Sequence, residues 1–161
     1  MNNRWLILGV AFWALSACAT REPSRSESAA ADAPTQTAED QLPAQTLDPG
    51  ACGLFLWTTD KPSRFVFFMR AGESDAKVQS ADGPKDLRLT HQEGSLMGQF
   101  ATKTVFQTAS AEQVLLSFGP GEEIDGGQRI RNGRLVFLGK DNWETIVPVV
   151  GLAACQTADV E

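Results

Sequence analysis

The chain has 161 residues, with 20 acidic and 14 basic side chains and a formal net charge of -6 at pH 7. This length has room for one domain of common size and no more. The acidic balance argues against nucleic acid as a partner, because binding to phosphates needs clustered Lys and Arg.

The N-terminus has the order of segments that is typical of a secretory signal peptide. One positive charge at Arg4 precedes an apolar run from Trp5 to Leu15, and small residues follow. The run is too short for a transmembrane helix, which needs about 20 apolar residues. We therefore expect residues 1–17 to be an export signal that is removed.

The stretch Leu15–Cys18, with the sequence Leu-Ser-Ala-Cys, closely resembles the lipobox of bacterial lipoproteins. The resemblance covers only the first 18 residues. It implies acylation of Cys18, including a palmitate chain, and a mature protein attached to a membrane of the cell envelope by lipid. Ala19, where Asp would favour the inner membrane, implies sorting to the outer membrane. The alternative is an ordinary signal peptide with a cysteine after small residues by chance.

From Ala19 to Asp48 the composition changes to mainly Ala, Ser, Thr, Glu, Gln and Pro, and only Leu42 and Leu47 are large and apolar. Such a segment cannot bury enough apolar surface to offset the entropy lost on ordering. We predict a lipidated cysteine and a disordered linker over residues 18–48. The alternative is that part of this segment, mostly residues 42–49, packs on the domain.

Residues 49–155 predict an all-β domain, followed by a tail over residues 156–161. Short segments rich in Val, Ile, Leu, Phe and Thr alternate with turn residues, without a 3.6-residue apolar period. We expect a small antiparallel sandwich or barrel of about eight short strands. The predicted strands cover residues 54–59, 64–70, 76–79, 87–90, 96–106, 113–118, 128–131, 134–138 and 145–152. Turns are expected at residues 60–63, 82–84, 119–121, 132–133 and 140–142.

The first predicted hairpin is apolar on both strand faces. This pattern suits either a strand pair that a linker or loop covers, or a pair with an exposed binding face. For the second alternative, the candidate apolar interaction face consists of Phe55, Trp57, Phe65 and Phe67.

A second hairpin is predicted at the two-residue turn Asn132-Gly133. Its register pairs Arg131 with Arg134, so Arg129, Arg131 and Arg134 share one face, here called the arginine face. Like charges opposite one another are unfavourable, so this face needs solvent or nearby anions.

Two sources of anions are considered for the arginine face. The acidic side chains of Glu122, Glu123 or Asp125 could fold against it and neutralise it from within the chain. Alternatively it is a candidate anion-binding face for a carboxylate or phosphate group of an envelope ligand, because Arg forms bidentate contacts with such groups.

The cysteines predict one disulfide bond. If Cys18 is acylated, Cys52 and Cys155 remain to pair in an oxidising compartment. Their bridge would place the first and last strands side by side and antiparallel. Pro148 cannot donate a hydrogen bond to a sheet, which favours a sandwich seam over a closed barrel. The alternative is two buried free thiols.

Residues with catalytic potential are few. His91 is the only histidine, in the polar stretch 90–94 that predicts a solvated turn, and there is no recognisable serine elbow. The acidic stretch 121–127 lacks the alternating ligands of an EF-hand, so no metal site is predicted. Residues 119–121 lack the third glycine of a dinucleotide site, and no cofactor is expected.

These observations favour a non-catalytic envelope lipoprotein whose β domain binds a protein or a cell-wall component. The architecture is similar to that of lysozyme-inhibitor lipoproteins, but the Ser-Gly-rich inhibitory loop of that family is not found, so the similarity covers architecture only. The alternative is a small hydrolase that acts through Asp and Glu. A concave pocket with two close carboxylates would favour the enzyme, and an aromatic patch would favour binding.

Overall fold

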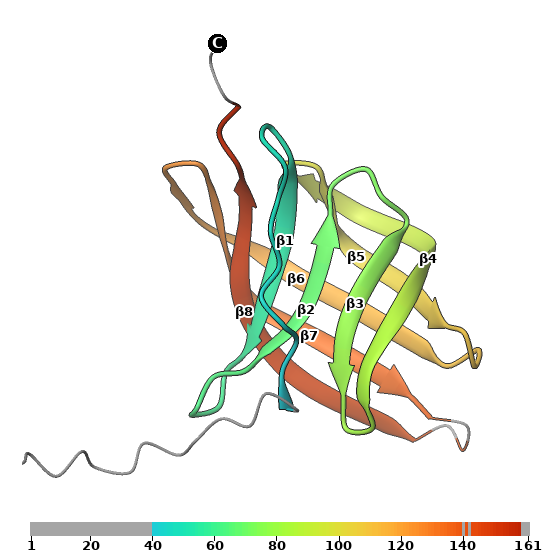
Figure 1. Ribbon diagram of the computed structural model, residues 1–161. Helices are drawn as coiled ribbons and strands as arrows, with labels where there is room; N and C mark the ends of the chain where they lie inside the picture. Colours follow the sequence, from blue (N-terminus) through green and yellow to red (C-terminus); the bar gives the residue numbers. More distant parts are fainter. Residues whose placement is uncertain (1–39, 140, 142, 159–161) are drawn as a thin grey trace, which may run out of the picture. The chain divides into compact units, whose positions relative to one another are not determined.

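The computed structural model describes residues 40–139, 141 and 143–158. In this part of the chain eight antiparallel strands follow one another around a closed barrel, and the last strand pairs with the first (Figure 1). The expected all-β fold is confirmed, in its barrel form. The strands are β1 (Cys52–Thr58), β2 (Phe65–Arg70), β3 (Asp75–Ser80), β4 (Gly83–Met97), β5 (Phe100–Thr108), β6 (Gln113–Ile124), β7 (Gly127–Leu138) and β8 (Glu144–Cys155). The predicted signal, Cys18 and the linker up to residue 39 lie outside the described residues.

All eight strands contribute apolar side chains to one core inside the barrel. The rings of Phe67 and Phe106 pack against each other within it, with 5.5 Å between their centroids, and both residues are fully buried. Strands place alternate residues on opposite sides of a sheet, so each strand supplies its inward-facing set. Each large apolar side chain buried in this way stabilises the fold by about 1.5–3 kcal/mol.

The barrel is closed by β1 and β8, in a register that runs from Cys52 opposite Cys155 to Thr58 opposite Val149. The predicted Cys52–Cys155 disulfide is present. The preference for a sandwich seam, based on Pro148, is wrong. The carbonyl oxygen of Pro148 accepts a hydrogen bond from Thr59, just beyond the end of β1. The position of its missing N–H group therefore faces the chain where β1 has ended. Closing the barrel loses little hydrogen bonding between β1 and β8.

The predicted hairpin at Asn132-Gly133 is wrong, because β7 continues through these residues as one strand. The register between β7 and β8 shifts between Ile130 and Gly133, and Asn132 has a φ of 55°. These features define a bulge with Asn in the left-handed conformation, which Asn tolerates better than most residues. Arg131 consequently lies opposite Gly119 rather than Arg134.

Two other predicted turns also lie within strands. Residues 119–121 belong to β6, and the polar stretch 90–94 belongs to β4. In both strands the register with a neighbour shifts nearby, and such bulges bend long strands around a barrel. The turns expected near residues 60–63 and 82–84 connect β1 to β2 and β3 to β4.

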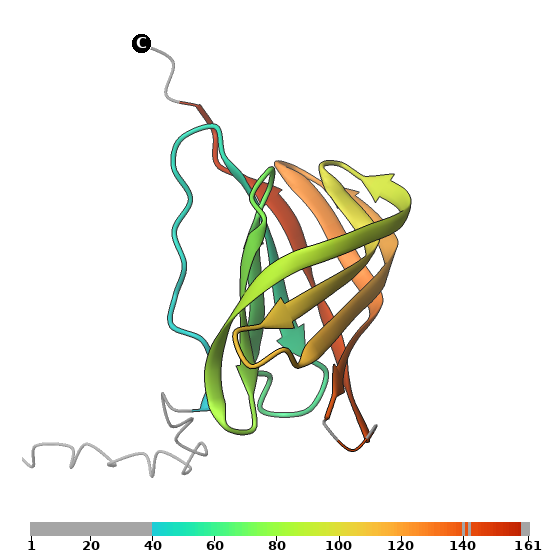
Figure 2. The same ribbon diagram turned by 90° about the vertical axis from the view of Figure 1, so that its right-hand side faces the viewer.

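Residues 40–51 form a strap along the outer side of the barrel (Figure 2). The Leu42 N–H donates to the Phe65 carbonyl oxygen at 2.8 Å, and the Arg70 guanidinium donates to the Thr46 carbonyl oxygen at 3.1 Å. Leu42 is only 3% exposed. From Leu42 onward the chain therefore packs on the domain, which is the alternative to a linker that extends to Asp48.

Candidate functional site

The two ends of the barrel differ. The Cys52–Cys155 disulfide lies at the end where β1 begins and β8 ends. The opposite end, the lower one in Figure 1, carries the connections β1–β2, β3–β4, β5–β6 and β7–β8. A cavity of about 420 Å³, here called the end pocket, opens between these connections. Its size is within the range of about 300–1,000 Å³ that is common for ligand sites.

The inner part of the end pocket is apolar. Val66 from β2 and Val114 from β6 are buried at its base, and Phe137 and Val147 from β7 and β8 are partly buried beside them. Trp143, in the β7–β8 connection, also lines the pocket and is 77% exposed. An apolar group that enters the pocket would contact aliphatic side chains and aromatic rings.

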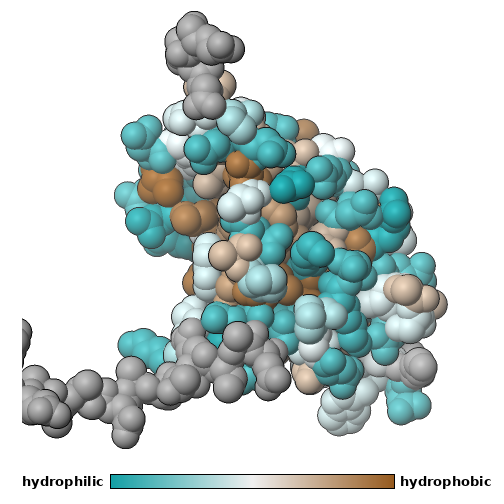
Figure 3. Space-filling model, viewed as in Figure 1, coloured by the Kyte–Doolittle hydropathy of each residue, from teal (hydrophilic) through white to brown (hydrophobic). Residues whose placement is uncertain are grey.

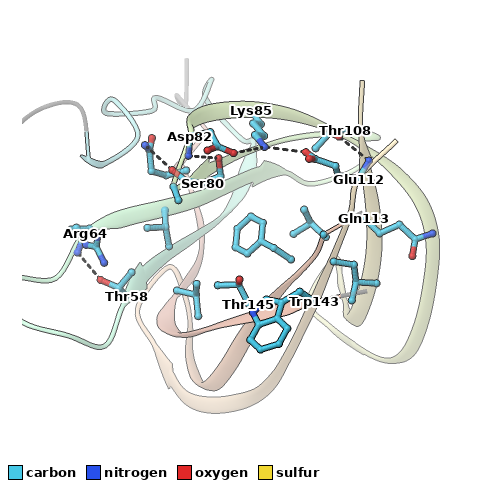
Figure 4. A pocket seen from close by; sticks show the side chains of 18 of the residues that line it. Thr58, Arg64, Ser80, Asp82, Lys85, Thr108, Glu112, Gln113, Trp143 and Thr145 are labelled. Carbon is cyan, nitrogen blue, oxygen red and sulfur yellow. Dashed lines mark hydrogen bonds and ion pairs between the residues drawn. The ribbon is translucent and has the colours of Figure 1, made fainter. Parts of the chain in front are cut away.

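An ion-pair cluster forms one wall of the end pocket. The Lys85 ammonium lies 3.0 Å from Glu112 Oε2 and 3.4 Å from Asp82 Oδ2. The hydrogen bond to Glu112 raises the pKa of Lys85, although partial desolvation acts in the opposite direction. Figure 4 shows Lys85, Asp82 and Glu112 along one side of the pocket, with Trp143 and Thr145 on the other. The pocket therefore has a charged wall and a wall that carries an aromatic ring.

The β5–β6 turn fixes the position of Glu112. The Ser110 hydroxyl donates to Glu112 Oε2 at 3.2 Å, and the Glu112 N–H donates to Thr108 Oγ1 at 3.1 Å. Ala111 has a φ of 63°, which turns the chain so that Glu112 lines the end pocket. The carboxylate is held in place before any ligand binds.

A second polar group lies at the β1–β2 connection. The Arg64 guanidinium donates to Asp60 Oδ2 at 2.9 Å, and the Arg64 N–H donates to Thr58 Oγ1 at 3.0 Å. A hydrogen bond from Thr58 and the charge of Arg64 lower the pKa of Asp60. Arg64 lines the end pocket with its charge already balanced by Asp60.

The structure separates the residues of the predicted apolar interaction face. Phe55, Trp57 and Phe65 lie together on the outer surface, with Trp57 and Phe65 ring centroids 5.2 Å apart. Phe67 is wrongly included, because it belongs to the core inside the barrel. The β1–β2 register shifts between Leu56 and Trp57, which interrupts the inside-outside alternation of β2.

Phe68 takes the place of Phe67 on the outer surface. Its ring centroid lies 5.0 Å from that of Phe55, and the two residues with Trp57 and Phe65 form the outer aromatic cluster. Leu42 and Leu47 of the strap pack against this cluster, so Phe65 and Phe68 are buried. Figure 3 shows apolar residues among hydrophilic ones on this face of the molecule.

The arginine face exists, although not through a hairpin. Arg129, Arg131 and Arg134 are all exposed on the outer side of β7, because the bulge restores the outward direction at Arg134. Glu122 Oε2 lies 3.7 Å from Arg129 Nε and 3.8 Å from an Arg131 amino group, so the acidic stretch supplies one internal counterion. Among the described residues, no carboxylate lies within ion-pair distance of Arg134. Such exposed pairs contribute about 0–1 kcal/mol each.

His91 lies on the exposed surface of β4 opposite Val105, not in a turn. Its Nε2 is 3.8 Å from Glu93 Oε2. In the described ranges no group of three or more His, Cys, Asp or Glu side chains could hold a metal ion. Within the same ranges there is also no helix long and apolar enough to cross a membrane.

Comparisons with known proteins give no further guide to function. No family model, no curated protein and no solved structure matches the chain. The geometry of the barrel and the chemistry of its surfaces therefore have to carry the functional inference.

Proposed function

We propose that this chain is a lipid-anchored protein of the cell envelope, whose barrel binds a small molecule or a protruding group of a protein or cell-wall partner without catalysing a reaction. The end pocket carries this proposal. Closed barrels of eight strands are just wide enough to be filled by side chains or to hold one small ligand. Here the core fills most of the barrel, and the end pocket of about 420 Å³ lies at the end away from the disulfide.

The location rests on the lipobox-like stretch before Cys18 and the polar segment that follows it. Asp40, where the described part of the chain begins, is itself one of the residues that line the end pocket. The segment that leads back to Cys18 therefore joins the barrel beside this pocket.

A carboxylate-dependent hydrolase is the competing function, since Asp82 and Glu112 both line the end pocket. Such an enzyme needs a carboxyl group that keeps its proton near neutral pH to act as general acid. Here both carboxylates are engaged by Lys85, whose ammonium group lies 3.4 Å from Asp82 Oδ2 and 3.0 Å from Glu112 Oε2. This arrangement supports binding over acid catalysis. The similarity to lysozyme-inhibitor lipoproteins stays a prediction from architecture.

Methyl NMR of the full-length protein with 1-hexanol, a small neutral probe, tests the proposal. As 1-hexanol is added, we expect the methyl signals of Val66 and Val114 to shift until the site is saturated. The methyl signals of the outer residue Val150 should not shift. Val147→Phe should fill the end pocket and abolish these shifts. Ile146→Phe, at the exposed neighbouring position on β8, is the matched control and should leave them unchanged. Shifts at Val150 instead of the pocket residues would refute a ligand site at this end.

A further inference from the structure

We propose that the end pocket selects ligands in which an apolar group carries a positively charged amine. This inference rests on the proposed binding function and adds the class of ligand. It depends on three features of the described residues: the charge balance of the pocket wall, the position of these charges beside the cavity, and the apolar surface opposite them.

The charge balance at the end pocket is negative. Among the described residues, the lining carboxylates are those of Asp40, Asp82 and Glu112, and the lining cations are Lys85 and Arg64. The counterion of Arg64 is Asp60, at 2.9 Å. Three lining carboxylates thus accompany two lining cations, which leaves a formal charge of -1 among the described residues that line the end pocket.

Neither cation can bind an anionic ligand without breaking an ion pair that it already makes. Lys85 is shared between two carboxylates, and Arg64 is held by Asp60. A ligand carboxylate would have to displace one of these partners and would then leave like charges close together, which is unfavourable. An ammonium group instead adds a cation where carboxylates are in excess. An ionised carboxylate has about four acceptor sites over its two oxygens, so Asp82 can accept from a ligand while it still accepts from Lys85.

The opposite wall suits the other half of such a ligand. Trp143 and Thr145 face the charged wall across the cavity in Figure 4, and Phe137, Val147 and Val66 form the apolar interior. Burial of an alkyl or aromatic group there would favour binding by about 25 cal/mol per Å² of apolar surface removed from water. The indole ring of Trp143 also attracts cations at its face. The apolar wall would therefore bind the apolar group of the ligand, and the charged wall would bind its ammonium group.

Three probes of one chain length separate charge from size: hexylamine, 1-hexanol and hexanoate. With the full-length protein at pH 7 and the Val66 and Val114 methyl signals as readout, we expect hexylamine to bind at least about tenfold more tightly than hexanoate, with 1-hexanol between them. Glu112→Gln and Asp82→Asn should each reduce the preference for hexylamine over 1-hexanol several-fold. Asp86→Asn removes the same charge from an exposed position of β4 and is the matched control.

The outcomes separate the two proposals. If none of the three probes shifts the pocket signals, the binding function itself fails. If 1-hexanol binds but hexanoate binds as well as hexylamine or better, the pocket stands and the selectivity for amines is overturned. Asp82→Asn keeps the test valid should Glu112→Gln unfold the β5–β6 turn, because Asp82 lies in the separate β3–β4 connection.

Discussion

Cys52 and Cys155 lie directly opposite each other on β1 and β8, with their Cα atoms 3.9 Å apart and their sulfur atoms bonded. The bond joins the first and last strands at the end of the barrel opposite the end pocket.

The disulfide predicts a large loss of stability on removal. The two cysteines are 103 residues apart, and the chain-entropy model gives about 4.7 kcal/mol for a loop of about 100 residues. We expect Cys52→Ala with Cys155→Ala to lower the free energy of unfolding by about 2–5 kcal/mol in urea denaturation. The Cys18→Ser variant is the control and should unfold like the unmodified protein. Equal stability of the wild type with and without reductant would contradict the prediction.

The strap predicts a local effect at Leu42. Removal of a buried Leu side chain costs about 2–5 kcal/mol in a core, and less where the segment can detach. We expect Leu42→Ala to abolish the hydrogen-exchange protection of amide 42, which donates to Phe65, and to leave the barrel amides protected. Leu96→Ala, at a residue 74% exposed, is the matched control and should change neither. Retained protection at amide 42 would show that Leu42 does not hold the strap.

Lys85 predicts a dependence of stability on alkaline pH. Its pKa is raised above the ordinary value of 10.5, so the folded state binds this proton more tightly than the unfolded state. The stabilisation is complete below the unfolded pKa of about 10.4 and is lost as the pH rises through the folded pKa. We therefore expect Lys85→Met to lower the free energy of unfolding at pH 7–9, with a difference from wild type that shrinks above about pH 10.4.

Lys77→Met is the control for this titration. Lys77 pairs with Asp86 at 3.0 Å, but both side chains are more than half exposed, so its removal should cost at most about 1 kcal/mol. Urea denaturation of both variants from pH 7 to pH 11.5 measures the difference. A constant deficit for Lys85→Met across this range would mean that the ion pair with Glu112 does not set its contribution.

The bulge at Asn132 predicts opposite effects of two small substitutions. Its φ of 55° is left-handed, which costs most residues about 1–2 kcal/mol and glycine almost nothing. We expect Asn132→Ala to be about 1 kcal/mol less stable than Asn132→Gly in thermal or urea unfolding. The reverse order would mean that the chain does not take the left-handed conformation at this position.

Much of the fold could be predicted from local patterns. Strand segments, the all-β class and the Cys52–Cys155 pair follow from apolar alternation, turn residues and the number of cysteines. The sequence does not predict the long strands, because glycine and asparagine are typical of turns. In β6 and β7 the same residues form bulges that curve the closed sheet. Local sequence does not distinguish a bulge from a hairpin turn, since both need the same backbone conformations.

The end pocket was missed for a different reason. Lys85 and Glu112 are 27 positions apart, and neither lies in a recognisable motif. They meet because alternate connections of an up-and-down barrel lie at the same end, and this is known only once strand order is known. The covering of the outer aromatic cluster was foreseen as an alternative, but Phe68 could not be chosen over Phe67 before the register shift in β2 was seen.

The most direct test of the central claim is an intermolecular NOE measurement on the full-length protein with hexylamine. The account predicts NOEs from the alkyl protons to the methyl groups of Val66, Val114 and Val147 and to the Trp143 ring, with none to Val150 on the outer surface. NOEs confined to Val150 or to the outer aromatic cluster, with none inside the barrel end, would contradict it.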